Sequence, residues 1–536
     1  MKILKSALFL SMGLLVACAE KSLELDETTD RILSPWHSLT SEEVAEVATA
    51  VTEAVDAQVV FNRISLLEPL KQDALAWDEH SVAARGADVL YRSEKSSYRV
   101  QYDFQTSALS DPQTIVSGQP MLVGAEIVTA LDAVNALSEV REALARRGVS
   151  ARNGLCLPRT VGRFFTSLAD PVTDRLVRFD CFNIRGQSGL GLLPTTSAYA
   201  RPVEGISVLF DVEELRLIEF VDSFADAEAP PSDFDVIEFH ASALETRAPL
   251  NKVAIAQEQG PNFSVTGSQI DWQNWRFHLR FDPRQGTVLN NVGIVTDEGV
   301  RPVAYEIAMS EMFVPYQDPD THWFYRAYFD MGEYGFGNMA TALKGNDCPP
   351  NAVFQNVVLH TAAGEPFIAE NRVCLFEFDP GYPSWRHHES LYDEVPGIEK
   401  HNSRRATNLV VRMVAVIGNY DYFQDYVFQQ DGRVRIRLIS TGIDATKGVF
   451  AATLADAAAQ TETATGTLIA PYRLGVNHDH FFSYRIDFDI DGTDNNFVRQ
   501  RLQSVRQPND AIRQGVWGVT REAVKSEQQA QTVMQV

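Results

Sequence analysis

The spacing of apolar positions predicts helices alternating with strands over the first 230 residues. Thr40 and Glu43 form a capping box, and the apolar residues that follow recur every three to four positions, so they would share one helix face. Strand-like runs come next, at residues 59–67, 86–91 and 98–104. These patterns predict a small α+β domain over residues 36–110.

A second unit with the same order of elements follows. A helical pattern runs from Gly124 to Arg147 and ends at Gly148, because glycine commonly terminates a helix. Strand-like runs then lie around residues 155–158, 175–181 and 206–211. We therefore predict a second small α+β domain over residues 111–230.

From about residue 245 the pattern becomes that of β-strands almost throughout. Apolar and polar side chains alternate from Trp275 to Phe281, as in a strand with one buried face. Asp431-Gly432 separates two further strand-like runs, and this dipeptide favours a tight hairpin turn. The fold class predicted for the chain is α+β, with two small α+β domains followed by a large antiparallel β-sandwich over residues 245–536.

The composition is that of a globular protein with a large acidic excess. Apolar residues make up 45% of the chain and charged residues 22%. Asp and Glu together number 71 against 47 Lys and Arg, which gives a net charge of −24. A chain this acidic repels nucleic acid, so DNA or RNA binding is excluded as a function.

The N-terminus predicts export from the cytoplasm. Lys2 and Lys5 precede an apolar run that is too short to span a bilayer, and this run ends at Cys18. The segment resembles a bacterial lipoprotein signal, in which residues 1–17 are removed and Cys18 carries the lipid; a plain secretory signal is the alternative. Residues 18–35 would form a polar tether. We expect an exported protein anchored only through this lipid, in the outer membrane and facing the periplasm or the cell surface.

Four cysteines remain after Cys18, and in an oxidising compartment they are expected to pair. Two local disulfides, one between Cys156 and Cys181 and one between Cys348 and Cys374, are the simplest scheme. Four cysteines allow three pairings, so the spacing alone leaves the scheme open.

A metal site is suggested by His478 and His480, which stand at the start of an alternating apolar run. Side chains two apart on a strand point the same way, so both imidazoles would face one side and lie close enough to hold one ion. Imidazole on an apolar face suits copper or zinc. The alternative is a pair of hydrogen-bonded histidines in the core.

Asn419-Tyr420-Asp421, followed by a hairpin and then by the two histidines, resembles the copper-containing amine oxidase family. In that family the tyrosine is converted to topaquinone by its own copper and dioxygen. The resemblance implies that Tyr420 is the precursor of this quinone and that His478 and His480 are copper ligands.

Residues 311–316 and 328–337 resemble the segment that carries the catalytic base in the same family. The resemblance implies that Asp330 is the base and that Tyr328 gates the substrate channel. It also implies that Tyr316 hydrogen-bonds the quinone oxygen and that Asn419 orients the ring.

The resemblance further implies one disulfide and one peripheral ion site. It pairs Cys348 with Cys374. It also matches Asp487, Asp489 and the carbonyl of Phe488 to part of a calcium-type site of hard oxygen ligands. Two solvated strand aspartates are the alternative for these positions.

The implied function is oxidative deamination of primary amines by dioxygen, with copper and topaquinone as cofactors and a homodimer as the assembly. The products would be an aldehyde, ammonia and hydrogen peroxide. The family's third copper-ligating histidine belongs to a part that lies beyond Val536, so the resemblance implies a β-sandwich that is incomplete at its C-terminus. The alternative function is a catalytically impaired or truncated amine-oxidase-like lipoprotein that binds an amine or a partner.

Overall fold

The structure is a computed structural model that describes residues 33–531, except for 163–165, 171, 186–197, 234–247, 249, 252–255 and 393. The predicted signal, Cys18 and most of the predicted tether lie outside the described residues. Among the helices of the described part, none is long and apolar enough to cross a membrane.

The first small domain packs one helix against an antiparallel sheet. Helix α1 (Ser41–Ala54) begins at the predicted capping box, in which Thr40 and Glu43 bond to each other's backbone N–H. The helix buries its valines against the sheet. The strands are β1 (Val60–Leu67), β2 (Gly86–Ser93), β3 (Ser96–Asp103), β4 (Ala108–Leu109) and β5 (Gln113–Thr114), and a short helix α2 (Lys71–Ala76) follows β1.

The second small domain has two helices where the sequence predicts one. The pattern between Gly124 and Arg147 divides into α3 (Gly124–Ala136) and α4 (Ser138–Arg146), because Leu137 adopts an extended conformation with ψ of 137°. Asn135, near the end of α3, makes a tertiary contact with β6. Its side-chain amide donates to the carbonyl of Cys156 and accepts from the N–H of Cys156. The helices cover a four-stranded sheet of β6 (Gly154–Arg159), β7 (Leu176–Asn183), β8 (Pro202–Asp211) and β9 (Arg216–Asp222).

The rest of the described chain forms a sandwich of two antiparallel sheets. One sheet contains β10 (Phe263–Thr266), β11 (Gln269–Trp272), β12 (Trp275–Asp282), β13 (Gly286–Thr296), β14 (Gly299–Pro315), β15 (Ala327–Phe329) and β26 (Phe481–Phe488). The other contains β16 (Val353–His360), β17 (Pro366–Phe378), β20 (Asn408–Ile417), β21 (Tyr420–Gln429) and β22 (Val434–Gly442). Phe277 and Phe428 stack across the core at 4.3 Å between centroids. The predicted fold class is confirmed, and the hairpin at Asp431-Gly432 joins β21 to β22 as expected.

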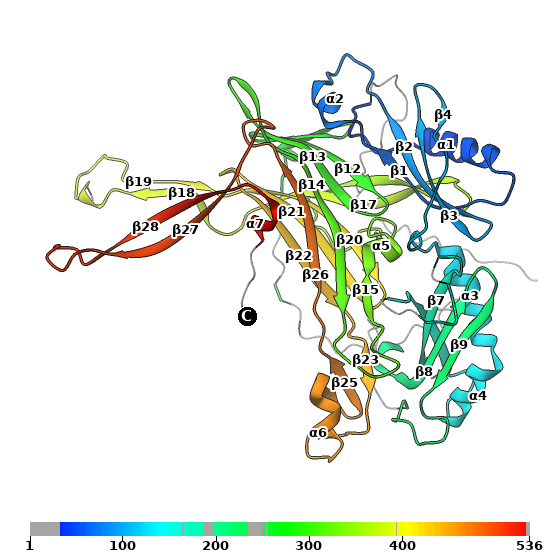
Figure 1. Ribbon diagram of the computed structural model, residues 1–536. Helices are drawn as coiled ribbons and strands as arrows, with labels where there is room; N and C mark the ends of the chain where they lie inside the picture. The colour runs from blue at the N-terminus through cyan, green and yellow to red at the C-terminus, as the bar shows by residue number, and fades with distance from the viewer. Residues whose placement is uncertain are drawn as a thin grey trace, which may run out of the picture.

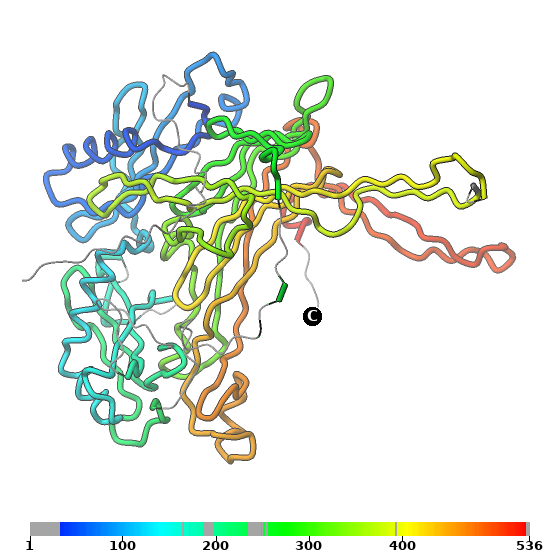
Figure 2. The backbone as a smooth tube through the Cα atoms, turned by 180° about the vertical axis from the view of Figure 1, so that it is seen from behind, coloured from blue at the N-terminus to red at the C-terminus, as the bar shows by residue number. Residues whose placement is uncertain are grey.

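Two long hairpins, which we call the arms, project from the sandwich on the side opposite the small domains (Figures 1 and 2). One arm consists of β18 (Pro383–His388) and β19 (His401–Arg405), and the other of β27 (Phe497–Arg506) and β28 (Gly515–Val524), which leads into α7 (Glu527–Ala530). Nearly every side chain of the arm strands is exposed.

The small domains lie on one side of the sandwich, the first towards one end and the second towards the other (Figure 1). Beside the second domain the sandwich extends into a small sheet of β23 (Thr446–Gly448), β24 (Gly466–Ala470) and β25 (Arg473–Val476) with helix α6 (Ala459–Glu462). Glu204 of β8 fastens this junction, because it accepts hydrogen bonds from the N–H of Gly448 at 2.7 Å and from the indole of Trp323 at 3.2 Å.

Candidate active site

Tyr420 is positioned by a two-residue turn. Ile417 at the end of β20 pairs directly with Tyr420 at the start of β21, so Gly418 and Asn419 alone form the loop. Gly418 adopts a φ of +61°, which favours glycine. The Asn419 side chain donates to the carbonyl of Ile443 at 2.7 Å and thereby ties the turn to the chain after β22. The bend expected at this Gly-Asn pair is therefore a tight turn that ends at Tyr420.

His478 meets this tyrosine directly. Its Nδ1 lies 2.7 Å from the carbonyl of Val476, which can only accept, so Nδ1 carries the proton and Nε2 has the free lone pair. Nε2 lies 2.9 Å from the hydroxyl of Tyr420. A histidine whose other nitrogen donates to a backbone carbonyl has the arrangement common among metal ligands.

His480 lies next to His478, with 5.2 Å between ring centroids, and its Nδ1 is 3.0 Å from the hydroxyl of Tyr422. Burial and the neighbouring His478 lower the pKa of His480 to about 4. The ring is therefore neutral at physiological pH, as a metal ligand must be. The donor set of these two residues fits copper, although no group of three or more potential ligands lies together among the described residues.

The predicted base segment lies across from the tyrosine. Tyr316 follows β14 and stacks on His478 at 4.2 Å between centroids. Tyr328 in β15 is buried, and its hydroxyl has no hydrogen-bond partner among the residues that the structure describes. Asp330 begins the short helix α5 (Asp330–Tyr334) and is only 5% exposed.

Asp330 lies where a carboxylate is destabilised. Burial raises its pKa well above the ordinary value, and the nearby Glu333 and Glu311 raise it further, whereas Arg159 lowers it. Burial likewise raises the pKa of Glu333 to about 7, although Thr160 and the N–H of Phe329 donate hydrogen bonds to its carboxylate. A buried carboxyl with a raised pKa is the usual form of a general base that works near neutral pH.

One pocket collects these groups. It is lined by Arg159, Val314, Tyr316, Tyr328, Asp330, Tyr334, Ile417, Gly418, Asn419, Tyr420 and Tyr422. The structure thus brings together all five residues predicted to be catalytic, and the two predicted copper ligands border the pocket through their contacts with Tyr420 and Tyr422.

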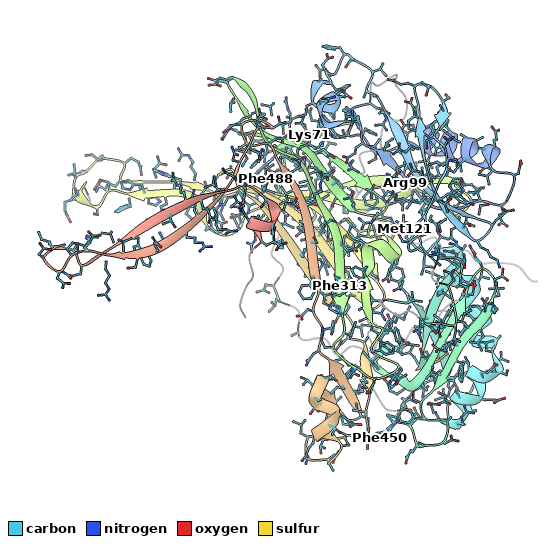
Figure 3. The ribbon with its side chains drawn as sticks, in the orientation of Figure 1. Lys71, Arg99, Met121, Phe313, Phe450 and Phe488 are labelled. Carbon is cyan, nitrogen blue, oxygen red and sulfur yellow. A yellow bond between two sulfur atoms is a disulfide. The ribbon has the colours of Figure 1, made fainter. Side chains whose placement is uncertain are left out.

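The residues predicted to form a calcium-type site contact a lysine in this structure, so their oxygen atoms are not free to bind a metal ion. The ammonium of Lys71 lies 2.9 Å from Oδ1 of Asp487 and 2.6 Å from Oδ1 of Asp489. The carbonyl of Phe488 accepts a hydrogen bond from Asn495. Lys71 and Phe488 lie at the same end of the sandwich (Figure 3). A lysine from the first small domain therefore takes the place of an ion at these carboxylates.

Both local disulfides of the simplest scheme are present. Cys348 pairs with Cys374, the pair implied by the resemblance, and Cys156 pairs with Cys181. The first bond secures the start of β16 to β17, and the second links β6 to β7.

Sequence reasoning missed three residues of the site. Tyr422 could have been found, since it lies two positions after Tyr420 on the same strand and must share its face. Asp444 follows β22. Burial is the main cause of the raised pKa of Tyr420, and Tyr316 and the carboxylate of Asp444 raise this pKa further. Arg159 belongs to the second small domain, and no pattern in the sequence connects it with the pocket.

Comparison with known families gives matches over most of the chain. Residues 264–536 match the family described as copper amine oxidase, enzyme domain. Residues 125–234 match the copper amine oxidase N3 domain, and residues 34–115 match the N2 domain.

Curated relatives and solved structures agree with these matches. Primary amine oxidase 2 of Arabidopsis thaliana is 32% identical over 504 residues, which cover 91% of this chain and 73% of the relative. The primary amine oxidase of Klebsiella aerogenes is 31% identical over 518 residues, which cover 94% of this chain and 65% of that protein. The crystal structure of a copper-containing benzylamine oxidase from Hansenula polymorpha has a TM-score of 0.80 at 22% identity and covers 92% of this chain and 76% of its own. At that identity the structural likeness concerns the fold.

Proposed function

This chain belongs to the copper amine oxidase family, and on that premise we propose that it oxidises primary amines to aldehydes with a quinone derived from Tyr420. The overall reaction would convert the amine, dioxygen and water into an aldehyde, ammonia and hydrogen peroxide. The observation that carries the proposal is the convergence of Tyr420 and Asp330 on one pocket, with Nε2 of His478 at 2.9 Å from the Tyr420 hydroxyl.

His478 and His480 would hold the copper ion, because Nε2 of His478 points at Tyr420 and the ring of His480 is neutral. When bound, copper and the quinone would supply the electrophilic carbonyl and the oxidising power that amino-acid side chains lack. The site fits this chemistry through its two adjacent imidazoles and through the tyrosine that they contact.

The chain's own residues would orient the substrate and move its proton. Asp330 would accept the proton from the carbon beside the amine nitrogen, since its raised pKa makes the carboxylate a stronger base. Tyr316, whose pKa burial raises to about 12, stays protonated and can donate a hydrogen bond. Asn419 would hold the ring of residue 420 through the turn, and Tyr328 would close the pocket from the side of β15.

The test is the mass of the tryptic peptide from Met413 to Arg433 after purification with copper and air. We expect a gain of two oxygens and a loss of two hydrogens, which fragment ions assign to Tyr420 and not to Tyr422 or Tyr426. The modified protein should also release hydrogen peroxide, formed from dioxygen, when primary amines are added. The Tyr420→Phe variant is the control, and it should show neither result. An unmodified Tyr420 in copper-loaded protein would refute the proposal.

A second candidate function is a lipoprotein that keeps the fold without catalysis and binds an amine or a partner. It is favoured by the absence, among the described residues, of a third ligand grouped with His478 and His480. Amine binding by calorimetry without peroxide release and without modification of Tyr420 would select this function.

The arms support a homodimer, which we propose as the assembly. Two-stranded ribbons are not stable alone in water, and these expose large apolar side chains, among them Trp385, Leu502 and Trp517. A second copy of the chain would cover them.

We also propose that the protein is exported and held at the outer membrane by a lipid on Cys18. The basis is the sequence of residues 1–18, which lie outside the described residues. Replacement of Cys18 by Ala should move the protein from the membrane fraction to the soluble fraction, whereas an unchanged distribution would refute the anchor.

A further inference from the structure

We infer that Arg159 forms an anion-binding subsite in the active-site pocket, so that the preferred substrate is a primary amine that also carries a carboxylate. The inference rests on the proposed function, since it names the substrate class of the same site. It goes beyond that function because nothing in the chemistry of amine oxidation requires an arginine.

Arg159 is held in place from two sides. It is the last residue of β6 in the second small domain, yet it lines the pocket beside Tyr328 and Asp330. The next residue, Thr160, donates from its N–H to the Tyr334 hydroxyl at 3.1 Å and from its own hydroxyl to the Glu333 carboxylate at 2.8 Å. These bonds to α5 fix the backbone that carries the guanidinium.

The guanidinium points to the turn that leads into Tyr420. A Cβ atom built on Gly418 would lie 2.9 Å from Nη1 of Arg159. A glycine at this position therefore leaves room for the arginine, and any ligand bound at Nη1 would lie close to the residue that follows the turn.

Arg159 lacks the partners that a buried guanidinium normally has. Its side chain is 9% exposed, and its Nε and Nη2 atoms make no hydrogen bond to any residue in the described part of the chain. The ring centroid of Tyr199 lies 4.9 Å from the guanidinium carbon, and this ring offers a cation–π contact but no hydrogen-bond acceptor. Buried charged groups are usually paired and hydrogen-bonded, so these free donors indicate a missing anion.

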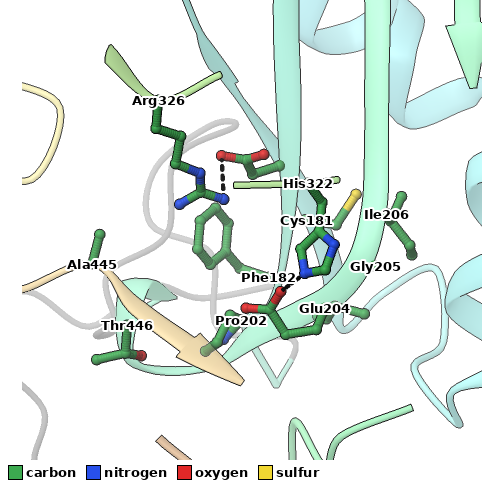
Figure 4. A pocket seen from close by; sticks show the side chains of 12 residues that line it. Cys181, Phe182, Pro202, Glu204, Gly205, Ile206, His322, Arg326, Ala445 and Thr446 are labelled. Carbon is green, nitrogen blue, oxygen red and sulfur yellow. Dashed lines mark ion pairs between the residues drawn. The ribbon is translucent and has the colours of Figure 1, made fainter. Parts of the chain in front are cut away.

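The nearest ion pair does not neutralise this charge. Nε of Arg159 lies 3.6 Å from Oδ2 of Asp180, beyond hydrogen-bond distance. The same carboxylate oxygen is paired with Arg326 at 3.0 Å (Figure 4), and the other oxygen accepts from the Tyr325 hydroxyl. The Asp180 carboxylate thus serves two guanidinium groups, and it accepts no hydrogen bond from Nε of Arg159.

The other buried carboxylate in this region is already engaged. Glu204 lies 2.7 Å from Nε2 of His322 (Figure 4), and it accepts hydrogen bonds from Trp323 and from the backbone of Gly448. It therefore gives Arg159 no direct contact.

The unsatisfied donors of Arg159 decide which amines fit the pocket best. The tyrosines that line it have raised pKa values because they are buried, so they are neutral at physiological pH. A simple alkylamine offers these donors no hydrogen-bond acceptor. An amine with a carboxylate instead presents its anionic end to the guanidinium and its amino group to Tyr420, and the charge-assisted hydrogen bonds would fix its orientation.

The experiment compares two substrates of similar length, 4-aminobutanoate and pentylamine, in the copper-loaded full-length enzyme. We expect the wild type to have the higher kcat/KM for 4-aminobutanoate. Arg159→Met should lower the ratio of kcat/KM for 4-aminobutanoate to kcat/KM for pentylamine by about tenfold to a hundredfold, because any effect of Arg159 on Asp330 is common to both substrates. Arg159→Lys should keep part of the preference. Arg152→Met removes the same charge from an exposed site in the same domain and should change neither value.

Binding of butanoate, an unreactive carboxylate, tests the subsite without turnover. By calorimetry we expect it to bind the wild type and the Arg152→Met variant, but not Arg159→Met or Arg159→Gln. The two Arg159 variants must melt at the wild-type temperature, and either one suffices if the other fails to fold. Equal loss of kcat/KM for both substrates, or butanoate binding that ignores Arg159, would overturn the inference. Butanoate binding that depends on Arg159 in a protein with unmodified Tyr420 would refute the proposed function and leave the subsite standing.

Discussion

The carboxyl of Asp330 is raised in pKa by burial and by two acidic neighbours, and these neighbours connect it to other parts of the fold. Glu311 accepts the N–H groups of Met331 and Gly332 at the start of α5, so its negative charge is fixed beside Asp330. Glu333 is held by Thr160 from the second small domain. The basicity of one residue thus depends on contacts from two domains.

Replacement of Asp330 by Asn should lower kcat by about 10²–10⁴-fold, because the amide cannot accept the proton. The quinone at Tyr420 should still form, since His478 and His480 are unchanged. Steady-state peroxide release and the mass of the 413–433 peptide measure the two effects separately. Full activity of the variant would contradict the assignment of Asp330 as the base.

Replacement of Glu333 by Gln should move the acid limb of the kcat/KM profile to lower pH. Asp330 acts only when deprotonated, so activity rises as pH rises through its pKa. Removal of the neighbouring charge makes this pKa less raised, and deprotonation then occurs at lower pH. A pH series with Glu79→Gln, an exposed carboxylate, serves as the control. A limb that stays in place or moves to higher pH would show that the Glu333 charge does not act on the base.

Single site residues could be predicted from the sequence where they belong to a short recognisable motif, and the structure brings those residues together. Tyr420 and Asp330 were found because each stands in a recognisable segment. Arg159 was not, because its position depends on how two domains pack, which leaves no local signal in the chain.

Single elements were predicted well where local interactions define them. Helix α1 starts at its capping box, and the hairpin of β21 and β22 turns at Asp431-Gly432. The break at Leu137 was not predicted, and the nearby Asn135 bonds the backbone of Cys156, a tertiary contact that has no local signal in the sequence. The residues near the end of β26 were misjudged for a similar reason: the cation they meet comes from α2, more than 400 residues away in the sequence.

Lys71→Met should destabilise the protein by about 1 kcal/mol, because Asp489 would lose the ammonium that binds it at 2.6 Å. Calcium should not change the unfolding midpoint of the wild type, whereas it should restore part of the stability of the variant by binding the freed carboxylates. Denaturant titrations with calcium and with a chelator measure both effects.

Lys95→Met is the matched control, since Lys95 also pairs with a carboxylate but lies at the exposed surface. Its unfolding midpoint should not change. A calcium-dependent midpoint in the wild-type protein would contradict the role of Lys71 as the resident cation.

At the scale of the whole molecule, the two arms expose large apolar side chains that the rest of the described chain does not cover. Leu502 and Trp517 are 66% and 73% exposed on the β27–β28 hairpin. We expect the double variant Leu502→Glu and Trp517→Glu to have half the wild-type mass by light scattering, because buried charge at the interface of the proposed dimer would oppose association. Val82→Glu alters an equally exposed apolar residue of the first small domain, and this control should stay dimeric. A wild-type protein that is already monomeric would refute the dimer.

The entry of β6 into the pocket has a consequence for how such proteins could diversify. Residues 311–337 and 408–480 carry the groups proposed for chemistry, whereas the guanidinium proposed for substrate choice belongs to a separately folded neighbour. Recombination that exchanged residues 111–230 between two members of the family would exchange this guanidinium, together with the contacts that Thr160 makes to Glu333 and Tyr334. A chimera of this kind would have the substrate preference of the protein that supplied the second small domain.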